Sequence, residues 1–203
     1  MIPTQLLLEK GAICKKMQAG EILFQENSPS NFYFQIETGR VRISNFLDEG
    51  KEVLHKMVCA NEGLGELAIL DAGVHIATAV ADSPCTVYKI NSSSFLEILR
   101  EYPSIHMLIT QEIAHDLRFK IFLTKLICNA CPEEIITQLL HRLNQERRLI
   151  CTDCNRLMLT RQQLANMTGL RVETVIRTMK MMEKSDKLQI IRGKVFVPSD
   201  GIE

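Results

Sequence analysis

The feature that most constrains the fold of this 203-residue sequence is a change of pattern near its middle. Up to residue 94, turn-forming residues recur at nearly even spacing and separate short runs rich in β-branched and aromatic side chains. These runs include Phe32–Ile36, Val41–Ile43, Val53–Leu54 and Thr86–Ile90. Short strands at intervals of about eight to twelve residues favour a β-sandwich or a barrel. The sequence therefore predicts a β-rich N-terminal domain.

After Ser94 the pattern becomes helical, because isoleucine or leucine recurs every fourth residue at positions 105, 109, 113, 117 and 121. We expect a helix of about 25 residues that ends at Cys131-Pro132, since proline cannot continue a helix. Such a helix is too apolar to be exposed on a small domain. Its apolar face either packs on the β domain or forms the seam of a homodimer, and the two arrangements are compatible.

A second amphipathic helix is predicted beyond Pro132 by the apolar residues Ile135, Ile136, Leu139, Leu140 and Leu143. A polar turn between Leu149–Cys151 and Leu157–Leu159 then predicts a β-hairpin. The boundary between the β-rich domain and a smaller helical domain is expected near residues 128–132.

The segment after this hairpin has the pattern of two short helices joined by a tight turn. Thr160 with Gln163 three residues later is a capping box, which begins a helix. Ala165 is small where a second helix must cross closely, Gly169 permits the tight turn, and Val175 can pack into the angle between the helices. This spacing predicts a helix-turn-helix.

Positive charge is concentrated in the same segment. The formal net charge of the chain is zero, but residues 160–194 carry eight basic and three acidic side chains, a net of +5. Lys187–Val197 predicts a hairpin that turns at Arg192-Gly193-Lys194 and forms a basic wing. A helix-turn-helix, a wing and local positive charge together predict DNA binding.

The second helix of this motif carries the candidate DNA-reading residues. Glu173 and Arg177 are four positions apart and share a face, so they can accept from a cytosine amine and donate twice to a guanine. Arg171 and Val172, at the start of the helix, are further base-reading candidates, and Arg171 is a poor N-cap. Contacts with DNA phosphates position the protein on the duplex but do not specify a base sequence. Such contacts are expected from Thr160, Arg161, Thr174, Lys180 and Lys194. The alternative is a surface salt bridge between Glu173 and Arg177 on an ordinary helix pair.

Nearly the whole chain resembles the cyclic-AMP receptor / fumarate-nitrate reduction regulator (CRP/FNR) superfamily. The matching motifs are Gly20–Phe24, Ile36–Val41 and Gly65–Leu67 in the β-rich half, and Thr160–Lys180 in the helical half. The resemblance implies an α+β fold with three parts. These are an N-terminal double-stranded β-helix (a jelly roll like a cyclic-nucleotide-binding domain) over 1–103, a long dimerisation helix and hinge over 104–130, and a winged helix-turn-helix domain over 131–203.

The resemblance also implies partners. It predicts a homodimer, joined through helix 104–128, that binds a two-fold symmetric operator in double-stranded DNA, and it allows a contact with RNA polymerase at Thr152-Asp153. Glu173 and Arg177 match the base-reading Glu and Arg of the family. Val172 is closer to the oxygen-regulator branch, whereas Ile176 is apolar where that branch often has serine, so a different half-site preference is expected.

Other functional classes find little support. The sequence has no P-loop, dinucleotide-binding or paired-carboxylate motif, so we expect a regulator and not an enzyme. No run of about eighteen apolar residues indicates a membrane helix. The N-terminus has no basic region before its short apolar run, which argues against a signal peptide and favours the cytoplasm.

The resemblance bears on the effector through three residues. In family members that bind cyclic nucleotides, a Gly-Glu pair is followed about ten residues later by Arg-Ser or Arg-Thr, whose arginine pairs with the cyclic phosphate. Here Glu66 is retained, but the matching positions hold Ile76 and Ala77, and isoleucine cannot neutralise a phosphate. We therefore expect no response to cyclic AMP, no cofactor and an effector of unknown identity. Glu66 is expected to close a turn by hydrogen bonds, and His75 to be a surface-loop residue.

Seven cysteines leave a second functional hypothesis open. Cys128 and Cys131 form one CxxC pair, and Cys151 and Cys154 form another, with nineteen residues between the pairs. This spacing suits a zinc or iron–sulfur site, a reversible disulfide within a pair, or inert cytosolic thiols. Because the intervening helix separates the pairs, we favour thiols without metal. The alternative function is a thiol- or metal-based redox-sensing regulator.

Overall fold

The computed structural model describes residues 1–198, with the exception of the Glu49 side chain. The chain divides into two compact units, Met1–Asp116 and the residues from Leu117 onward. The division falls inside one long helix, α4 (Pro103–Asn129). This helix has 27 residues, close to the length of about 25 residues that the apolar repeat predicts. Within residues 1–198, no helix combines the length and apolar character needed to cross a bilayer.

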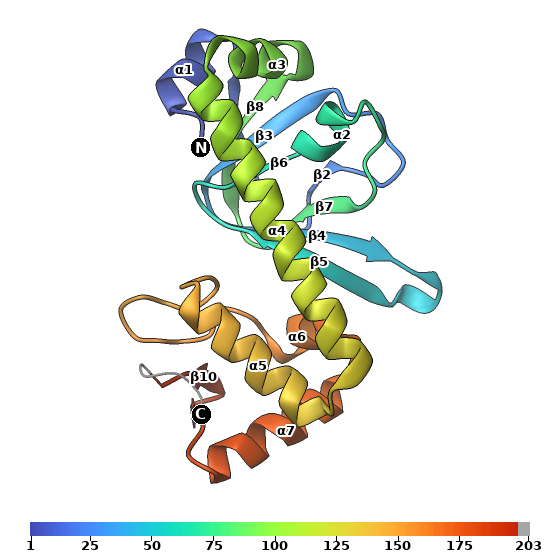
Figure 1. The fold of residues 1–203 in the computed structure, drawn as a ribbon, viewed down its shortest axis with the longest axis vertical. Coiled ribbons are helices and arrows are strands. Elements are labelled where there is room, and N and C mark those ends of the chain that lie inside the picture. The colour runs from blue at the N-terminus through green and yellow to red at the C-terminus, as the bar shows by residue number, and fades with distance from the viewer. Residues whose placement is uncertain (199–203) are drawn as a thin grey trace. The chain divides into compact units, whose positions relative to one another are not determined.

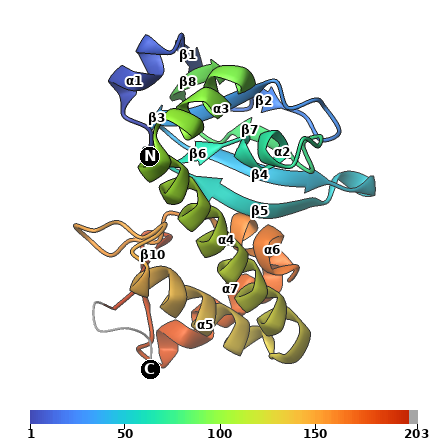
Figure 2. The ribbon, with the colours of Figure 1, turned by 45° about the horizontal axis from the view of Figure 1, so that its top comes forward.

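The first unit is a jelly roll of two antiparallel four-stranded sheets (Figures 1 and 2). One sheet has the strand order β1-β8-β3-β6 and the other β2-β7-β4-β5. The strands are β1 (Ile13–Met17), β2 (Ile22–Phe24), β3 (Phe32–Thr38), β4 (Val41–Phe46), β5 (Glu52–Val58), β6 (Gly63–Leu64), β7 (Thr78–Ala81) and β8 (Cys85–Asn91). Each predicted β-run lies within one of these strands, which confirms the β-rich domain.

Strand β3 is buried on both faces and links the two cores of this unit. Phe34 and Ile36 point into the apolar core that contains residues of both sheets. Tyr33 points the other way and stacks on Phe95, with 4.3 Å between the ring centroids. Because both faces are covered, residues 33–36 form a continuous buried run and not an alternating one.

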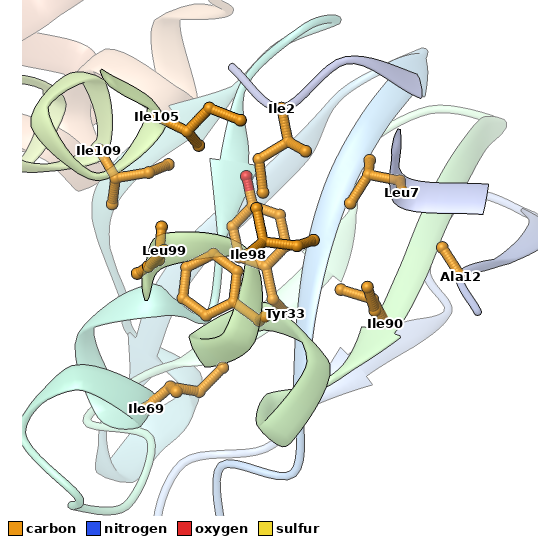
Figure 3. Close-up of a cluster of buried hydrophobic side chains, with 11 residues drawn as sticks. Ile2, Leu7, Ala12, Tyr33, Ile69, Ile90, Ile98, Leu99, Ile105 and Ile109 are labelled. Atoms are coloured by element: carbon orange, nitrogen blue, oxygen red, sulfur yellow. The ribbon is translucent and has the colours of Figure 1, made fainter. Parts of the chain in front are cut away.

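Helices cover the Tyr33 side of the first sheet. They are α1 (Thr4–Glu9), α3 (Ser92–Glu101) and the first turns of α4, whose Ile105 and Ile109 are buried there. Figure 3 shows their apolar side chains gathered around Tyr33. The remaining helical elements of the unit are α2 (Glu66–Leu70) and the short 3-10 helix η1 (Asp48–Gly50). The four-residue apolar repeat of α4 therefore begins as a packing surface for the jelly roll, as predicted.

Over its described residues, 117–198, the second unit contains the end of α4, three further helices and a hairpin. The helices are α5 (Pro132–Gln145), α6 (Arg161–Thr168) and α7 (Val172–Lys184), and the hairpin pairs β9 (Gln189–Ile191) with β10 (Lys194–Phe196). Leu139, Leu140 and Met182 are among its fully buried side chains. The break between α4 and α5 lies at Ala130-Cys131, directly before Pro132, as the sequence predicts.

The predicted hairpin at 149–159 is wrong in detail. The structure has a single bridge between Ile150 and Leu157 in place of two paired strands. Leu149 and Asn155 adopt left-handed backbone conformations, with φ of 57° and 54°, and so interrupt extended structure on both sides. Met158 N–H donates to the Leu149 carbonyl beside this bridge, and Leu157 N–H donates to the Val195 carbonyl of β10 at 2.9 Å.

The N-terminus is fixed to the jelly roll by one buried amide. Gln35 Nε2 donates to the Ile2 carbonyl oxygen at 2.9 Å, and Ile2 N–H donates to Gln35 Oε1 at 3.2 Å. Ile2 and Gln35 are 1% and 3% exposed, so neither backbone group of Ile2 can turn to solvent instead.

Gln35→Leu should therefore destabilise the jelly roll by about 2–4 kcal/mol, because it leaves two buried backbone groups without partners. All three tyrosines, Tyr33, Tyr88 and Tyr102, lie in this unit, and the chain has no tryptophan. Urea unfolding followed by tyrosine fluorescence thus reports on the jelly roll. The matched control is Glu37→Ala on the exposed end of β3, expected within about 0.5 kcal/mol of wild type. Equal midpoints for the two variants would contradict this role of Gln35.

Candidate functional site

Helices α6 and α7 form the predicted helix-turn-helix. Gln163 N–H donates to Thr160 Oγ1 at 3.1 Å, and Thr160 N–H donates to Gln163 Oε1 at 2.9 Å, which completes the capping box. Gly169 ends α6 in a left-handed conformation, with φ of 73°. Ala165 and Val175 are buried where the helices meet.

The outer face of α7 carries the candidate base-reading residues. Val175 and Met179 are buried against the rest of the unit, whereas Glu173 and Arg177 are exposed on the opposite side. Within residues 1–198, the side chains of Glu173 and Arg177 form no ion pair with each other or with a neighbour. The alternative of a surface salt bridge is therefore not what the structure shows, and both groups are free to contact another molecule.

The first turn of α7 lacks a side-chain cap, as predicted from Arg171. Arg171 occupies the N-cap position and makes no side-chain capping hydrogen bond. Its own side chain is exposed, while Val172 and Thr174 are half-buried. The first N–H groups of α7 are consequently available to an anion, since a helix N-terminus attracts negative charge.

Three further cations surround this face. Lys180 on α7 and Lys194 on β10 are exposed, and neither has an ion-pair partner in the part of the chain that the structure describes. Arg161 is half-buried, and its guanidinium donates a hydrogen bond to the Gly193 carbonyl oxygen. Arg161 thus connects α6 to the turn of the predicted wing, a contact that the sequence did not indicate.

A separate cavity of about 410 Å³ lies in the jelly roll, close to the three residues predicted to mark an effector site. Most of its lining is apolar, and it includes Ile76 and Ala77 but not Glu66; the other residues are Phe24, Ile43, Gly65, Leu67, Ala68, Leu70, Asp71, Val74, His75 and Ile113. Ile76 is 73% exposed and Ala77 is buried. No arginine or lysine lines the cavity, which therefore offers a phosphate no charge partner.

His75 is not a surface-loop residue, and that expectation is corrected. Its ring stacks on Phe24 with 3.7 Å between centroids, and the residue is 5% exposed. Two backbone hydrogen bonds turn the loop inward, from His75 N–H to the Ser28 carbonyl and from Asn27 N–H to the His75 carbonyl. Burial lowers the pKa of His75, which favours a neutral imidazole in the cavity wall. No local sequence signal distinguishes this histidine from a loop histidine.

Glu66 begins α2 directly after Gly65, whose φ is 94°. The residue as a whole is half-buried, but its Oε2 atom is shielded from solvent and has no hydrogen-bond partner within residues 1–198. The prediction that the Glu66 carboxylate closes a turn by hydrogen bonds therefore does not hold for its Oε2 atom. Burial raises the pKa of Glu66, and the nearby positive charge of Lys56 opposes that shift. Lys56 is itself paired with Asp116.

The structure does not bring the two CxxC pairs together. Cys128 lies in the last turn of α4 and Cys131 directly precedes α5, whereas Cys151 and Cys154 lie beyond its other end. Among the described residues, no three or more His, Cys, Asp or Glu side chains form a group that could hold a metal ion. Cys151 and Cys154 lie three residues apart within their own turn, and hydrogen bonding within that turn lowers the pKa of the Cys151 thiol.

Comparisons with known proteins assign both units to families. Residues 14–102 match the cyclic nucleotide-binding domain, and residues 135–199 match the Crp-like helix-turn-helix domain.

Full-length relatives agree with this division. The chain is 25% identical to the cAMP-activated global transcriptional regulator CRP of Haemophilus influenzae, over 90% of this chain and 82% of that protein. It is also 25% identical to the transcriptional activator protein anr of Pseudomonas aeruginosa, over 97% of this chain and 80% of that protein. The structure of a CooA variant from Carboxydothermus hydrogenoformans has the same fold, with a TM-score of 0.80, 16% identity and coverage of 98% and 89% of the two chains. The chain belongs to the CRP/FNR family of DNA-binding transcription regulators.

Proposed function

We propose that this regulator is a homodimer that reads a two-fold symmetric operator through the exposed face of α7. The observation that carries the proposal is the free, outward position of Glu173 and Arg177 on α7, one helical turn apart. In a major groove these side chains match a cytosine amine and a guanine edge. Arg171 and Val172 flank them at the start of the helix and complete the base-reading set.

Phosphate contacts would position α7 in the groove. Lys180 and Lys194 provide unpaired cations, and Thr174 and Arg161 lie beside the N-termini of the two helices. Thr160 contributes chiefly through the capping box, because its hydroxyl already accepts from Gln163. Such contacts give affinity on any DNA sequence, whereas base contacts give specificity.

We propose that three consecutive parts of the chain have separate functions. Residues 1–103 form the jelly roll, 104–130 the dimerisation helix and hinge, and 131–203 the DNA-binding domain. Support for the helical seam comes from Leu117 and Ile121 on α4, which are 59% and 62% exposed and lie one turn apart. Apolar side chains of this size on one helical face favour association with a second copy.

The jelly roll, we infer, does not recognise a cyclic phosphate. Ile76 and Ala77 occupy the positions where phosphate recognition is expected, and the cavity beside them is lined mostly by carbon. A buried phosphate without a cationic partner would be strongly unfavourable there. A largely apolar effector without a phosphate fits this cavity better, and His75 and Asp71 are the polar side chains in its lining. Glu66 would then influence the site only indirectly.

Replacing both Glu173 and Arg177 with alanine should abolish sequence-specific DNA retention, since each base contact contributes about 1–3 kcal/mol of discrimination. The matched control is Lys180→Ala on the same helix. It should weaken binding to all DNA sequences and leave specificity unchanged. The slope of log affinity against log salt concentration should fall by about one phosphate contact for each subunit. Fluorescence anisotropy with specific and scrambled duplexes measures both effects. Retained specificity in the double variant would contradict the assignment.

Introducing a charge into the proposed seam should produce monomers. Ile121→Asp places a carboxylate among apolar side chains, so sedimentation is expected to change from a dimer to a monomer. Gln111→Glu introduces the same charge on α4 roughly 80° around the helix axis from Ile121 and should leave the dimer intact. A wild-type monomer, or an Ile121→Asp dimer as stable as wild type, would refute the seam.

Cyclic AMP should neither bind nor change DNA affinity. Calorimetry of the wild-type protein is expected to show no saturable heat with cyclic AMP, because no cation lines the cavity. The double variant Ile76→Arg/Ala77→Ser supplies the absent charge and hydroxyl, and is expected to gain measurable affinity. Saturable binding by wild type at the same cavity would show that the phosphate finds another partner.

A further inference from the structure

The second CxxC pair lies in a closed turn. Asn155 N–H donates to the Cys151 carbonyl oxygen, and Cys151 N–H donates to the Arg156 carbonyl oxygen, both at 2.8 Å. Cys151 and Cys154 are three residues apart within this helical turn, which places their side chains next to each other. Cys154 is exposed and Cys151 is half-buried, so small solutes can reach the pair.

Hydrogen bonds converge on the Cys151 sulfur. Hydrogen bonding from the Asp153 and Cys154 backbone and from the Cys154 side chain lowers the pKa of the Cys151 thiol. Consecutive N–H groups that point at one atom stabilise negative charge on it.

The same turn is bonded to the strand that carries the wing lysine. Leu157 N–H donates to the Val195 carbonyl at 2.9 Å, and Val197 N–H donates to the Asn155 carbonyl at 3.0 Å. Arg156 forms an isolated bridge with Phe196 between these two bonds. The residues that follow Cys154 are thus paired with β10, whose first residue is Lys194.

We propose that Cys151 and Cys154 are a modification site for a hydroperoxide, and that their disulfide weakens DNA binding by displacing the wing. The inference goes beyond the proposed DNA-binding function, on which only its second half rests. It also selects one of the two cysteine pairs as the reactive one.

The chemistry balances with hydrogen peroxide as the oxidant. The Cys151 thiolate attacks one peroxide oxygen, the O–O bond breaks, hydroxide leaves, and a sulfenic acid forms on Cys151. Cys154 then loses its proton and attacks that sulfur, the S–O bond breaks, and the departing hydroxide takes up a proton as water. Two thiols lose two electrons and two protons, and one peroxide becomes two waters.

In the proposed mechanism, disulfide formation changes the shape of the turn. A disulfide requires about 2.05 Å between the sulfur atoms, shorter than any hydrogen-bonded contact between two thiols. We expect the turn to tighten between Cys151 and Cys154 as the sulfur atoms bond, and Asn155–Leu157 to move with it. Because that segment is paired with β10, the strain reaches Lys194, a proposed phosphate contact.

The test uses the full-length protein, reduced and then titrated with hydrogen peroxide. Peptide mapping after alkylation identifies the disulfide, and fluorescence anisotropy measures affinity for an operator selected from random DNA by the reduced protein. The variants are Cys151→Ser and Cys154→Ser, and the matched control is the Cys128→Ser/Cys131→Ser double variant. Melting temperatures of the reduced proteins check that each variant folds.

Wild type and the control should form the Cys151–Cys154 disulfide, bind DNA about fivefold more weakly, and lose about one charge of salt dependence for each wing. Cys154→Ser should stop at the sulfenic acid, which dimedone traps, and Cys151→Ser should show neither change. Absence of this disulfide in wild type, or its formation with unchanged affinity, would overturn the proposal. The mapping needs no DNA, so failure of the reduced protein to bind any sequence would count against the proposed function alone.

Discussion

The close packing of α6 against α7 is the constraint on which the candidate DNA interface depends. Ala165 and Val175 are buried at the crossing, and Gly169 makes the left-handed turn that sets the angle. Once Val175 and Met179 face inward, helical geometry places Glu173 and Arg177 on the opposite side. The proposed reading face is therefore a geometric consequence of four small or apolar residues that lie outside the base-reading set.

The jelly roll depends on a comparable constraint, the burial of β3 on both faces. Tyr33 and Gln35 anchor the helices and the N-terminus on one side, while Phe34 and Ile36 fill the space between the sheets. The apolar cavity beside this framework is lined mainly by α2 and the loop after it, together with Phe24 of β2, Ile43 of β4 and Ile113 of α4. A ligand in this cavity would touch the helix that we propose as the dimer seam, which provides a physical route from binding to dimer geometry.

Much of this architecture is predictable from the sequence because strong periodic signals act locally. The four-residue repeat of α4, the Thr160–Gln163 capping box and the turn at Gly169 each depend on residues within one or two helical turns. Long-range contacts are the reason for the errors. His75 is buried because Phe24, far away in sequence, provides a stacking surface. The 149–159 segment keeps only the Ile150–Leu157 bridge of its predicted pairing, and the Leu157 N–H bonds to the distant Val195 of β10. Likewise, the division of α4 between two compact units depends on its tertiary contacts and not on a break in its repeat.

Selection of binding sites from random double-stranded DNA by the purified full-length protein tests the central claim most directly. We predict enrichment of a two-fold symmetric motif whose half-sites are about one helical turn apart, centre to centre, with a G·C pair in each half-site. The same selection with the Glu173→Ala/Arg177→Ala variant should lose that pair. Enrichment of no motif, or of an asymmetric motif unaffected by the double substitution, would contradict the account.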